Sequence, residues 1–151
     1  MCRIGVISDT HRLVRPETLT ALDGVEHIIH AGDMGSPDVI AELRRIAPVT
    51  AIRGNVDVGD WAREFPETAV VELGGIMIYV VHNIVSVDLD PQASGFAAVV
   101  YGHSHAPMQH TKDGILFFNP GSAGPRRFNL PISMGYLIIR AKQVSGEIIT
   151  L

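Results

Sequence analysis

Side chains that can bind a metal ion recur at the ends of short apolar segments in this 151-residue chain. They lie in the sequences SDTH, HAGD, RGN, VVH and GHSH, and they are Asp9, His11, Asp33, Asn55, His82, His103 and His105. Imidazoles mixed with carboxylates suit first-row divalent ions better than the all-oxygen shells of Ca²⁺. The set therefore predicts a centre for two divalent metal ions, with Mn²⁺ as the first choice and Fe²⁺, Zn²⁺ or Ni²⁺ as alternatives.

The order of these motifs carries more information than any one of them. An isolated Asp or Asn after a strand is usually a turn former, and a lone His usually fills a core or surface position. Here DxH, GD, GN, H and GHxH follow one another, each beside a predicted strand end. Gly32, Gly54 and Gly102 directly precede candidate ligands, and we expect them to let the loops approach the metals closely.

The elements that would position these residues are short β-branched segments bounded by Gly, Asp or Asn. We predict strands at 3–7, 26–29, 49–52, 68–73, 76–81, 97–100 and 115–118, and helices at 16–22 and 37–46. The first half therefore winds as βαβαβ, whereas the second half is mostly β, with hairpin turns at Gly74–Gly75 and Asp113–Gly114. This pattern predicts an α/β protein with two sheets face to face and helices outside. The candidate ligands would gather beyond the carboxyl ends of the strands.

Composition limits the classes of function. The length and the apolar content of 46% predict a single domain over residues 1–151. The only cysteine, Cys2, permits no internal disulfide, and we expect a reducing, cytoplasmic location. The apolar runs are far shorter than the roughly 20 residues that cross a bilayer, so we expect no membrane segment. A net charge of −4 argues against broad binding to nucleic acid.

With these motifs in this order, the chain resembles the calcineurin-like metallophosphoesterase superfamily along essentially its whole length, especially the small prokaryotic YfcE-like phosphodiesterases. The resemblance implies a four-layer α/β/β/α sandwich with two mixed β-sheets flanked by helices. It also implies one metal on Asp9, His11 and His105, a second on Asn55, His82 and His103, and Asp33 as the bridge. The segment Asn119–Ser122, followed by Arg126, resembles a further element of the family.

The resemblance implies hydrolysis of a small phosphoester by water that the two metals activate, without a side-chain nucleophile. The two carboxylates offset only about half of the charge of two divalent ions, so the centre would attract a phosphate oxyanion. We predict that four of the metal-binding residues take direct part in catalysis, namely Asp9, Asp33, Asn55 and His103. We predict substrate binding by Arg12, Asp57 and Arg126.

Two positions depart from the pattern of the superfamily. Phosphatases of this group often carry histidine after the GN motif, where this chain has Val56, and that histidine can protonate the leaving group. Such assistance is worth about 10²- to 10⁴-fold, so phosphodiesters are favoured over alkyl phosphomonoesters unless Asp57 or another group supplies the proton. Asn83 stands where glycine commonly follows the ligand histidine, and we expect it to narrow the pocket. His30 either orients the bridging carboxylate or simply fills a buried position in its strand, and the sequence favours neither interpretation.

Two other classes of function compete with the hydrolase. A retromer scaffold subunit resembles the same fold, so the chain could be a protein-interaction module with a residual metal site. A DNA-repair nuclease of the superfamily is a weaker alternative, because the chain has no basic excess. Exposed edge strands make a homo-oligomer a further expectation.

Overall fold

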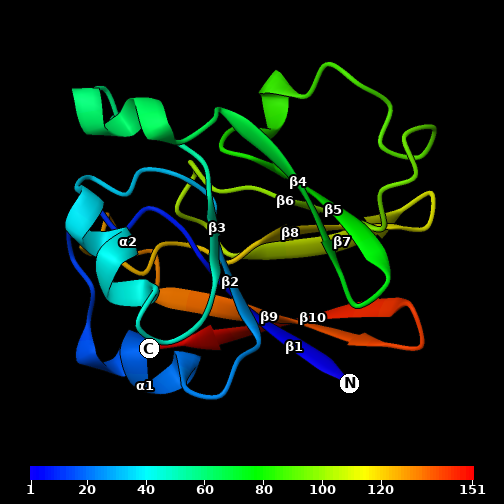
Figure 1. Cartoon of the computed structure of the whole chain (residues 1–151), viewed down its shortest axis with the longest axis horizontal. Helices are drawn as coiled ribbons and strands as arrows, with labels where there is room; N and C mark the ends of the chain where they lie inside the picture. Colours follow the sequence, from blue (N-terminus) through cyan, green and yellow to red (C-terminus); the bar gives the residue numbers. More distant parts are fainter.

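In a computed structural model, which describes residues 1–151, the chain forms two five-stranded sheets that pack face to face (Figure 1). The first sheet has the order β10–β9–β1–β2–β3, and its strands are β1 (Cys2–Ile7), β2 (His27–His30), β3 (Val49–Ala51), β9 (Ser133–Arg140) and β10 (Gln143–Thr150). Strands β1, β2 and β3 are parallel, whereas β9 is antiparallel to both β1 and β10.

Two helices connect the parallel strands and confirm the predicted βαβαβ winding. Helix α1 (Pro16–Leu22) and helix α2 (Pro37–Leu43) both begin with proline, which is favourable at the first helical position. The hydroxyl of Ser36 accepts a hydrogen bond from the backbone N–H of Asp38 and caps α2. Helix α2 ends at Leu43 and is therefore shorter than the predicted segment 37–46. None of the helices is long and apolar enough to cross a membrane.

The second sheet has the order β4–β5–β6–β8–β7. Its strands are β4 (Thr68–Leu73), β5 (Ile76–Val81), β6 (Ala98–Val100), β7 (Met108–Lys112) and β8 (Ile115–Asn119). Strands β5, β6 and β8 are parallel, and β4 and β7 join them as antiparallel edges. Both predicted hairpin turns are present, and all four of their residues have positive φ. Strands β7, β9 and β10 were not among the predicted strands.

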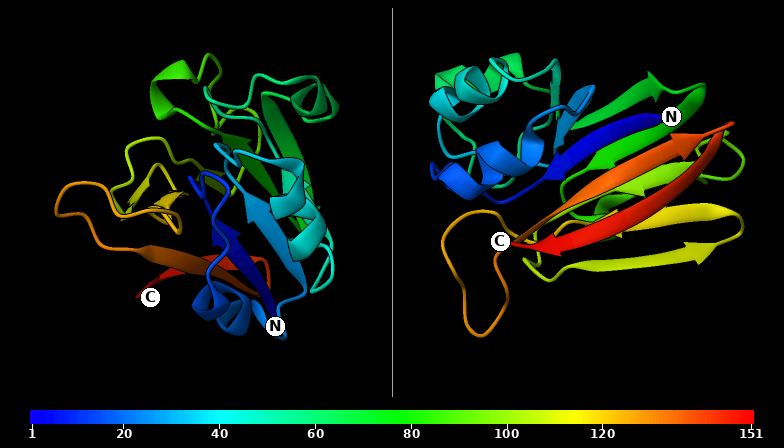
Figure 2. Two further views of the ribbon diagram at one scale, coloured as in Figure 1. Left: turned by 90° about the vertical axis from the view of Figure 1, so that its left-hand side faces the viewer. Right: turned by 90° about the horizontal axis from the view of Figure 1, so that it is seen from below.

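Figure 2 shows the layers of the fold from two further directions. Three apolar clusters pack against the two sheets. One cluster lies between the first sheet and helices α1 and α2, and another lies between the two sheets. The third covers the outer side of the second sheet with the segment around the 3₁₀ helix η2 (Ile84–Ser86). A second 3₁₀ helix, η1 (Asp60–Glu64), precedes β4. The predicted α/β fold with two mixed sheets and flanking helices is confirmed, with a short 3₁₀ turn in the outermost layer.

Candidate metal centre

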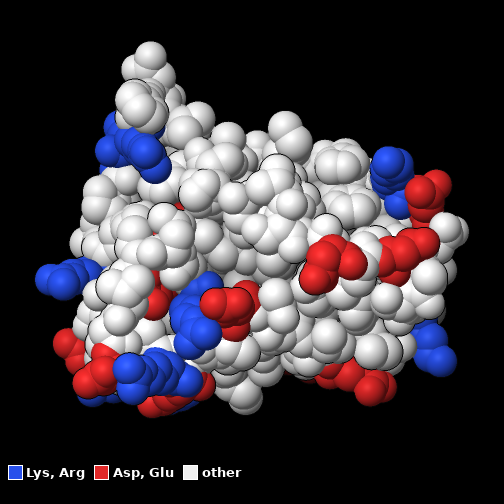
Figure 3. All heavy atoms as spheres, turned by 90° about the horizontal axis from the view of Figure 1, so that it is seen from above, with Lys and Arg blue, Asp and Glu red and all other residues white.

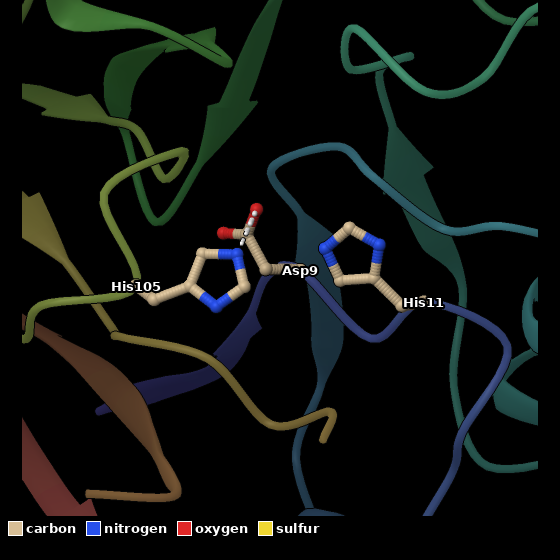
Figure 4. A group of neighbouring side chains, drawn as sticks. All are labelled: Asp9, His11 and His105. Atoms are coloured by element: carbon tan, nitrogen blue, oxygen red, sulfur yellow. Dashed lines mark ion pairs between the residues drawn. The ribbon is translucent and has the colours of Figure 1, made fainter. Parts of the chain in front are cut away.

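The candidate ligands follow the parallel strands of both sheets. Asp9 and His11 follow β1, Asp33 follows β2, Asn55 follows β3, His82 follows β5, and His103 and His105 follow β6. These side chains form two triplets in which one possible ligand atom from each residue lies within 4.8 Å of those from the other two. The triplets are Asp9–His11–His105 and Asp9–Asp33–His82. Figure 4 shows the rings of His11 and His105 on either side of the Asp9 carboxylate. The fold thus brings together side chains from loops far apart in sequence.

Asp9 lies at the centre of both triplets and is fully buried. Its Oδ2 accepts hydrogen bonds from the Ser8 hydroxyl at 2.7 Å and from the His103 backbone N–H at 3.1 Å. Its Oδ1 has no hydrogen-bond partner and lies 3.5 Å from Nε2 of His105 and 3.8 Å from Nε2 of His82. Burial raises the pKa of Asp9 to about 6. An unpaired buried carboxylate oxygen is costly, and a bound cation would satisfy it.

Asp33 lies between histidines that the resemblance assigns to different metals. Its Oδ2 is 3.2 Å from Nε2 of His82 and 3.7 Å from Nε2 of His11, while its Oδ1 accepts the backbone N–H of Val56 at 3.1 Å. Burial raises the pKa of Asp33, but the nearby imidazole of His82, together with the Val56 backbone N–H and His11, outweighs burial, and the pKa falls to about 2. An ionised carboxylate in this place fits the predicted bridge, and its ligation of metal stays a prediction.

His82 is held in the tautomer that a metal requires. Its Nδ1 lies 2.7 Å from the carbonyl oxygen of Ala31, an acceptor only, so Nδ1 carries the proton. The other ring nitrogen, Nε2, is buried, has no hydrogen-bond partner and faces the carboxylates. Nε2 of His11 is likewise buried without a partner. Lone pairs aimed at one point without a donor are the arrangement expected for a cation site.

Asn55 and His103 form the exposed side of the centre. Oδ1 of Asn55 lies 3.3 Å from Nδ1 of His103, and the His103 ring lies edge-on to that of His82 with centroids 5.2 Å apart. Opposite them, the rings of His11 and His105 stack at 5.3 Å. Burial, followed by the charge of His11, lowers the pKa of His105 to about 4, so this ligand candidate is neutral near pH 7. The candidate site is therefore buried at Asp9, Asp33, His82 and His105 and exposed at Asn55 and His103.

The backbone at the candidate ligands is strained. A positive φ is found at five of them, Asp9 (55°), His11 (45°), Asp33 (58°), His103 (71°) and His105 (63°), and also at Arg12 (75°). A left-handed conformation costs a residue with a Cβ about 1 to 3 kcal/mol and persists where the surroundings impose it. Such residues concentrate at functional sites. This local strain marks the loops as a functional site, which the residue types alone could not show.

The three glycines before the candidate ligands make the close approach of the loops possible, as expected. A Cβ on Gly54 would collide with the carboxylate and backbone nitrogen of Asp33. A Cβ on Gly32 would lie 2.7 Å from Nδ1 of His82, and one on Gly102 would meet the Ser8 hydroxyl. Each loop that carries a ligand therefore packs against another through a position that tolerates no side chain.

Asp57 has a different environment from the one that a substrate-binding residue needs. The residue is 3% exposed, and its two side-chain oxygens accept hydrogen bonds from the backbone N–H groups of Met34 (3.1 Å), Gly35 (2.9 Å) and Gly54 (2.9 Å). The carboxylate thus joins the loop of Asp33 to the loop of Asn55. Its binding of substrate stays a prediction. A substrate would have to share the carboxylate oxygens with these three backbone N–H groups. Nothing in the sequence distinguished a carboxylate that joins two loops from one that binds substrate.

His30 supports the centre, although not through a hydrogen bond to the bridging carboxylate. Its Nδ1 accepts the backbone N–H of Gly32 at 3.1 Å, so Nε2–H donates to the Thr10 hydroxyl at 3.0 Å. That hydroxyl donates in turn to the carbonyl of Met34. Burial lowers the pKa of His30 to about 3, which keeps the ring neutral. His30 therefore holds the backbones of the two loops that carry Asp9 and Asp33.

The Asn119–Ser122 segment also holds two ligand loops together. The Ser122 hydroxyl donates to the Asp9 carbonyl at 2.9 Å, and the Asn119 amide donates to the Gly102 carbonyl at 3.2 Å.

The predicted substrate-binding residues Arg12 and Arg126 are exposed. Arg12 donates through Nε to the Gly35 carbonyl at 3.2 Å. The roles of both arginines stay predictions.

Sequence comparisons agree with the geometry. Residues 2–142 match the sequence model of the calcineurin-like phosphoesterase superfamily domain. A probable metallophosphoesterase of Methanothermobacter thermautotrophicus is 34% identical over 158 residues, an alignment that covers 97% of this chain and 91% of the relative. Phosphodiesterase YfcE of Escherichia coli K12 is 33% identical over 110 residues, which cover 68% of this chain and 60% of that enzyme.

Solved structures share the architecture. A predicted phosphoesterase from Streptococcus pneumoniae superposes with a TM-score of 0.76 at 25% identity, over 99% of this chain and 89% of its own. The vacuolar protein sorting 29 protein of Chaetomium thermophilum has a TM-score of 0.79 at 18% identity, over 99% of this chain and 96% of its own. The second likeness shows the fold alone.

Proposed function

The chain belongs to the calcineurin-like phosphoesterase superfamily, and from this premise we propose that it hydrolyses phosphodiesters with two divalent metal ions. The observation that carries the proposal is the convergence of buried ligand atoms without hydrogen-bond partners, Oδ1 of Asp9 and Nε2 of His11 and His82. We also propose Mn²⁺ as the metal, a cytoplasmic location and one domain over residues 1–151.

Asp9, His11 and His105 would hold one ion, Asn55, His82 and His103 the other, and Asp33 would contact both. Two ions there would lower the pKa of a water molecule and neutralise charge on the phosphoryl oxygens. Ala31 and Ser8 would keep His82 and Asp9 oriented through the hydrogen bonds they already make. Asn55 and His103, on the exposed side, would face the entering phosphate.

The test is hydrolysis of bis(p-nitrophenyl) phosphate by protein stripped of metal and then resupplied with Mn²⁺. Turnover should return with the metal, and Asp33→Asn should lower it about 100-fold or more, because the shared ligand loses its charge. Asp38→Asn, an exposed carboxylate on α2, is the matched control and should leave turnover unchanged. A folded, metal-loaded protein without turnover would contradict the proposal.

Protein interaction is the competing proposal, because the vacuolar sorting protein has the same fold. The two overlapping triplets formed by Asp9, His11, Asp33, His82 and His105 support the enzyme. Nucleic acid is disfavoured as a partner, because on the face shown in Figure 3 the basic and acidic groups lie beside one another and form no continuous basic surface. The discriminating result is metal-dependent turnover by the isolated chain.

A further inference from the structure

A cavity of about 880 Å³ opens beside the exposed side of the metal centre. Asn55, His82 and His103 belong to its lining, and so do residues of the segments that carry η1 and η2. Asp9, His11 and His105 take no part in its lining. A phosphate held at the centre would therefore have room for an organic substituent on one side, toward the cavity.

The apolar part of the lining offers no ring face to a ligand. Of its apolar residues, Ala62, Tyr79 and Val81 are almost completely buried, and Val58 alone is exposed. The ring of Tyr79 stacks on Phe96 at 5.2 Å with an interplanar angle of 16°. Apart from Val58 and the imidazole of His103, a nucleobase in this cavity would find no exposed apolar or aromatic surface on which to stack.

The polar part of the lining offers donors and acceptors together. The guanidinium of Arg53, with its side chain 32% exposed, lies 3.4 Å from the carboxylate of Glu67. Oδ1 of Asn83 accepts the backbone N–H of Val85, which leaves the amide NH₂ to donate elsewhere. Ser86 and Asp88 are exposed along the same wall. The lining holds Arg53 and Arg63 as well as Glu67 and Asp88, so a second anionic group would meet repulsion as well as attraction.

On this geometry, and on the premise that the proposed function holds, we propose that the cavity binds one alcohol group of the phosphodiester and that this alcohol is a polyol, such as glycerol or a sugar. A hydroxyl group both donates and accepts a hydrogen bond, which matches a wall of mixed polar groups. Arg53 and Asn83 are then specificity-determining residues that contact the polyol.

The test compares kcat/KM for glycerophosphoglycerol with kcat/KM for a dithymidine monophosphate, with Mn²⁺ present. The polyol diester should be favoured by about tenfold or more, because a site built to bind hydroxyl groups discriminates against a ligand that leaves its polar groups unpaired. Arg53→Met and Asn83→Ala should each raise KM for the polyol diester about fivefold or more, with a smaller effect on the dinucleotide. Arg140→Met, an exposed arginine at the end of β9, should change neither.

The outcomes separate the two proposals. If the protein with Mn²⁺ does not hydrolyse bis(p-nitrophenyl) phosphate, both the proposed function and this inference are wrong. Hydrolysis of the aryl diester together with equal or better use of the dinucleotide would overturn the polyol assignment alone. Equal losses on both diesters in Arg53→Met and Asn83→Ala would also overturn it. The comparison of substrates on the unaltered protein does not depend on how the variants fold.

Discussion

Asp57 accepts hydrogen bonds from two loops that each carry a candidate metal ligand. Asp57→Asn keeps the shape but replaces one acceptor oxygen with an NH₂ group that faces backbone donors. We expect a loss of about 2 kcal/mol or more in the free energy of unfolding, as for hydrogen bonds to a charged group, and weaker Mn²⁺ binding. Urea unfolding and Mn²⁺ titration measure the two effects. Asp60→Asn is the control, because the Asp60 side chain is 96% exposed, and equal effects at both positions would contradict the role.

Protonation of Asp9 should compete with metal binding. Burial raises the pKa of this carboxyl to about 6 in the metal-free protein, so the proton stabilises the metal-free fold at low pH and that contribution is lost as pH rises through about 6. A metal ion binds only the carboxylate form. Between pH 7.5 and pH 5, Mn²⁺ affinity should therefore fall about tenfold from this group alone.

Calorimetric Mn²⁺ titrations at the two pH values check this dependence on Asp9. Ser8→Ala removes a hydrogen bond that lowers the pKa of Asp9, so the decline in affinity should begin at a higher pH in this variant. An affinity that does not change with pH would exclude Asp9 as a ligand.

At the scale of elements, the sequence predicted the parallel strands well, since each is a short apolar run that ends at Gly, Asp or Asn. It missed β7 because all five of its residues are exposed and show no alternation. It missed the β9–β10 hairpin for two reasons. Its turn residues Ala141 and Lys142 have positive φ (50° and 63°) without a Gly or Asn signal, and Gly135 and Gly146 interrupt the strands. Pairing between strands overrode these local preferences.

The candidate ligands could likewise be chosen from sequence, because residue type and order suffice to select them, and their binding of metal stays a prediction. The supporting contacts of Asp57, His30 and Ser122 could not, since they depend on which backbone groups lie nearby after folding. Polar residues that follow a strand occur in ordinary turns as well. The three-dimensional approach of the loops is what gives these side chains their partners.

Loop packing should be as necessary as the ligands themselves. Gly54 has ordinary φ, but a Cβ there would collide with Asp33, so Gly54→Ala should displace the bridging candidate and lower Mn²⁺ affinity about 10- to 100-fold. Gly114→Ala is the opposite case, with φ of +77° and open space around the added Cβ. It should cost about 1 kcal/mol of stability and leave Mn²⁺ affinity unchanged. The idea would be abandoned if calorimetric titration gave both variants the same affinity.

At the scale of the whole molecule, the site depends on the two sheets keeping their carboxyl ends together. Phe118 on β8 is fully buried in the cluster between the sheets. Its ring packs against Gly135 on β9 and Gly146 on β10, where a Cβ would collide with it. The glycines that obscured these strands in the sequence are thus the positions that accept an aromatic ring from the opposite sheet. The same strand ends at Asn119, which holds the GHSH loop.

Phe118→Ala should therefore weaken both the fold and the site. Removal of a buried phenylalanine costs about 3 to 5 kcal/mol, and the cavity would lie between the sheets whose alignment brings the ligands together. Phe117→Ala is the matched control, because its partly exposed side chain points to the other face and stacks on His110 at 5.0 Å. It should cost about 2 kcal/mol or less. Urea unfolding measures stability, and Mn²⁺ titration well below the unfolding midpoint measures the site. If Phe118→Ala lowers stability but leaves Mn²⁺ affinity equal to that of Phe117→Ala, sheet alignment does not control the metal centre.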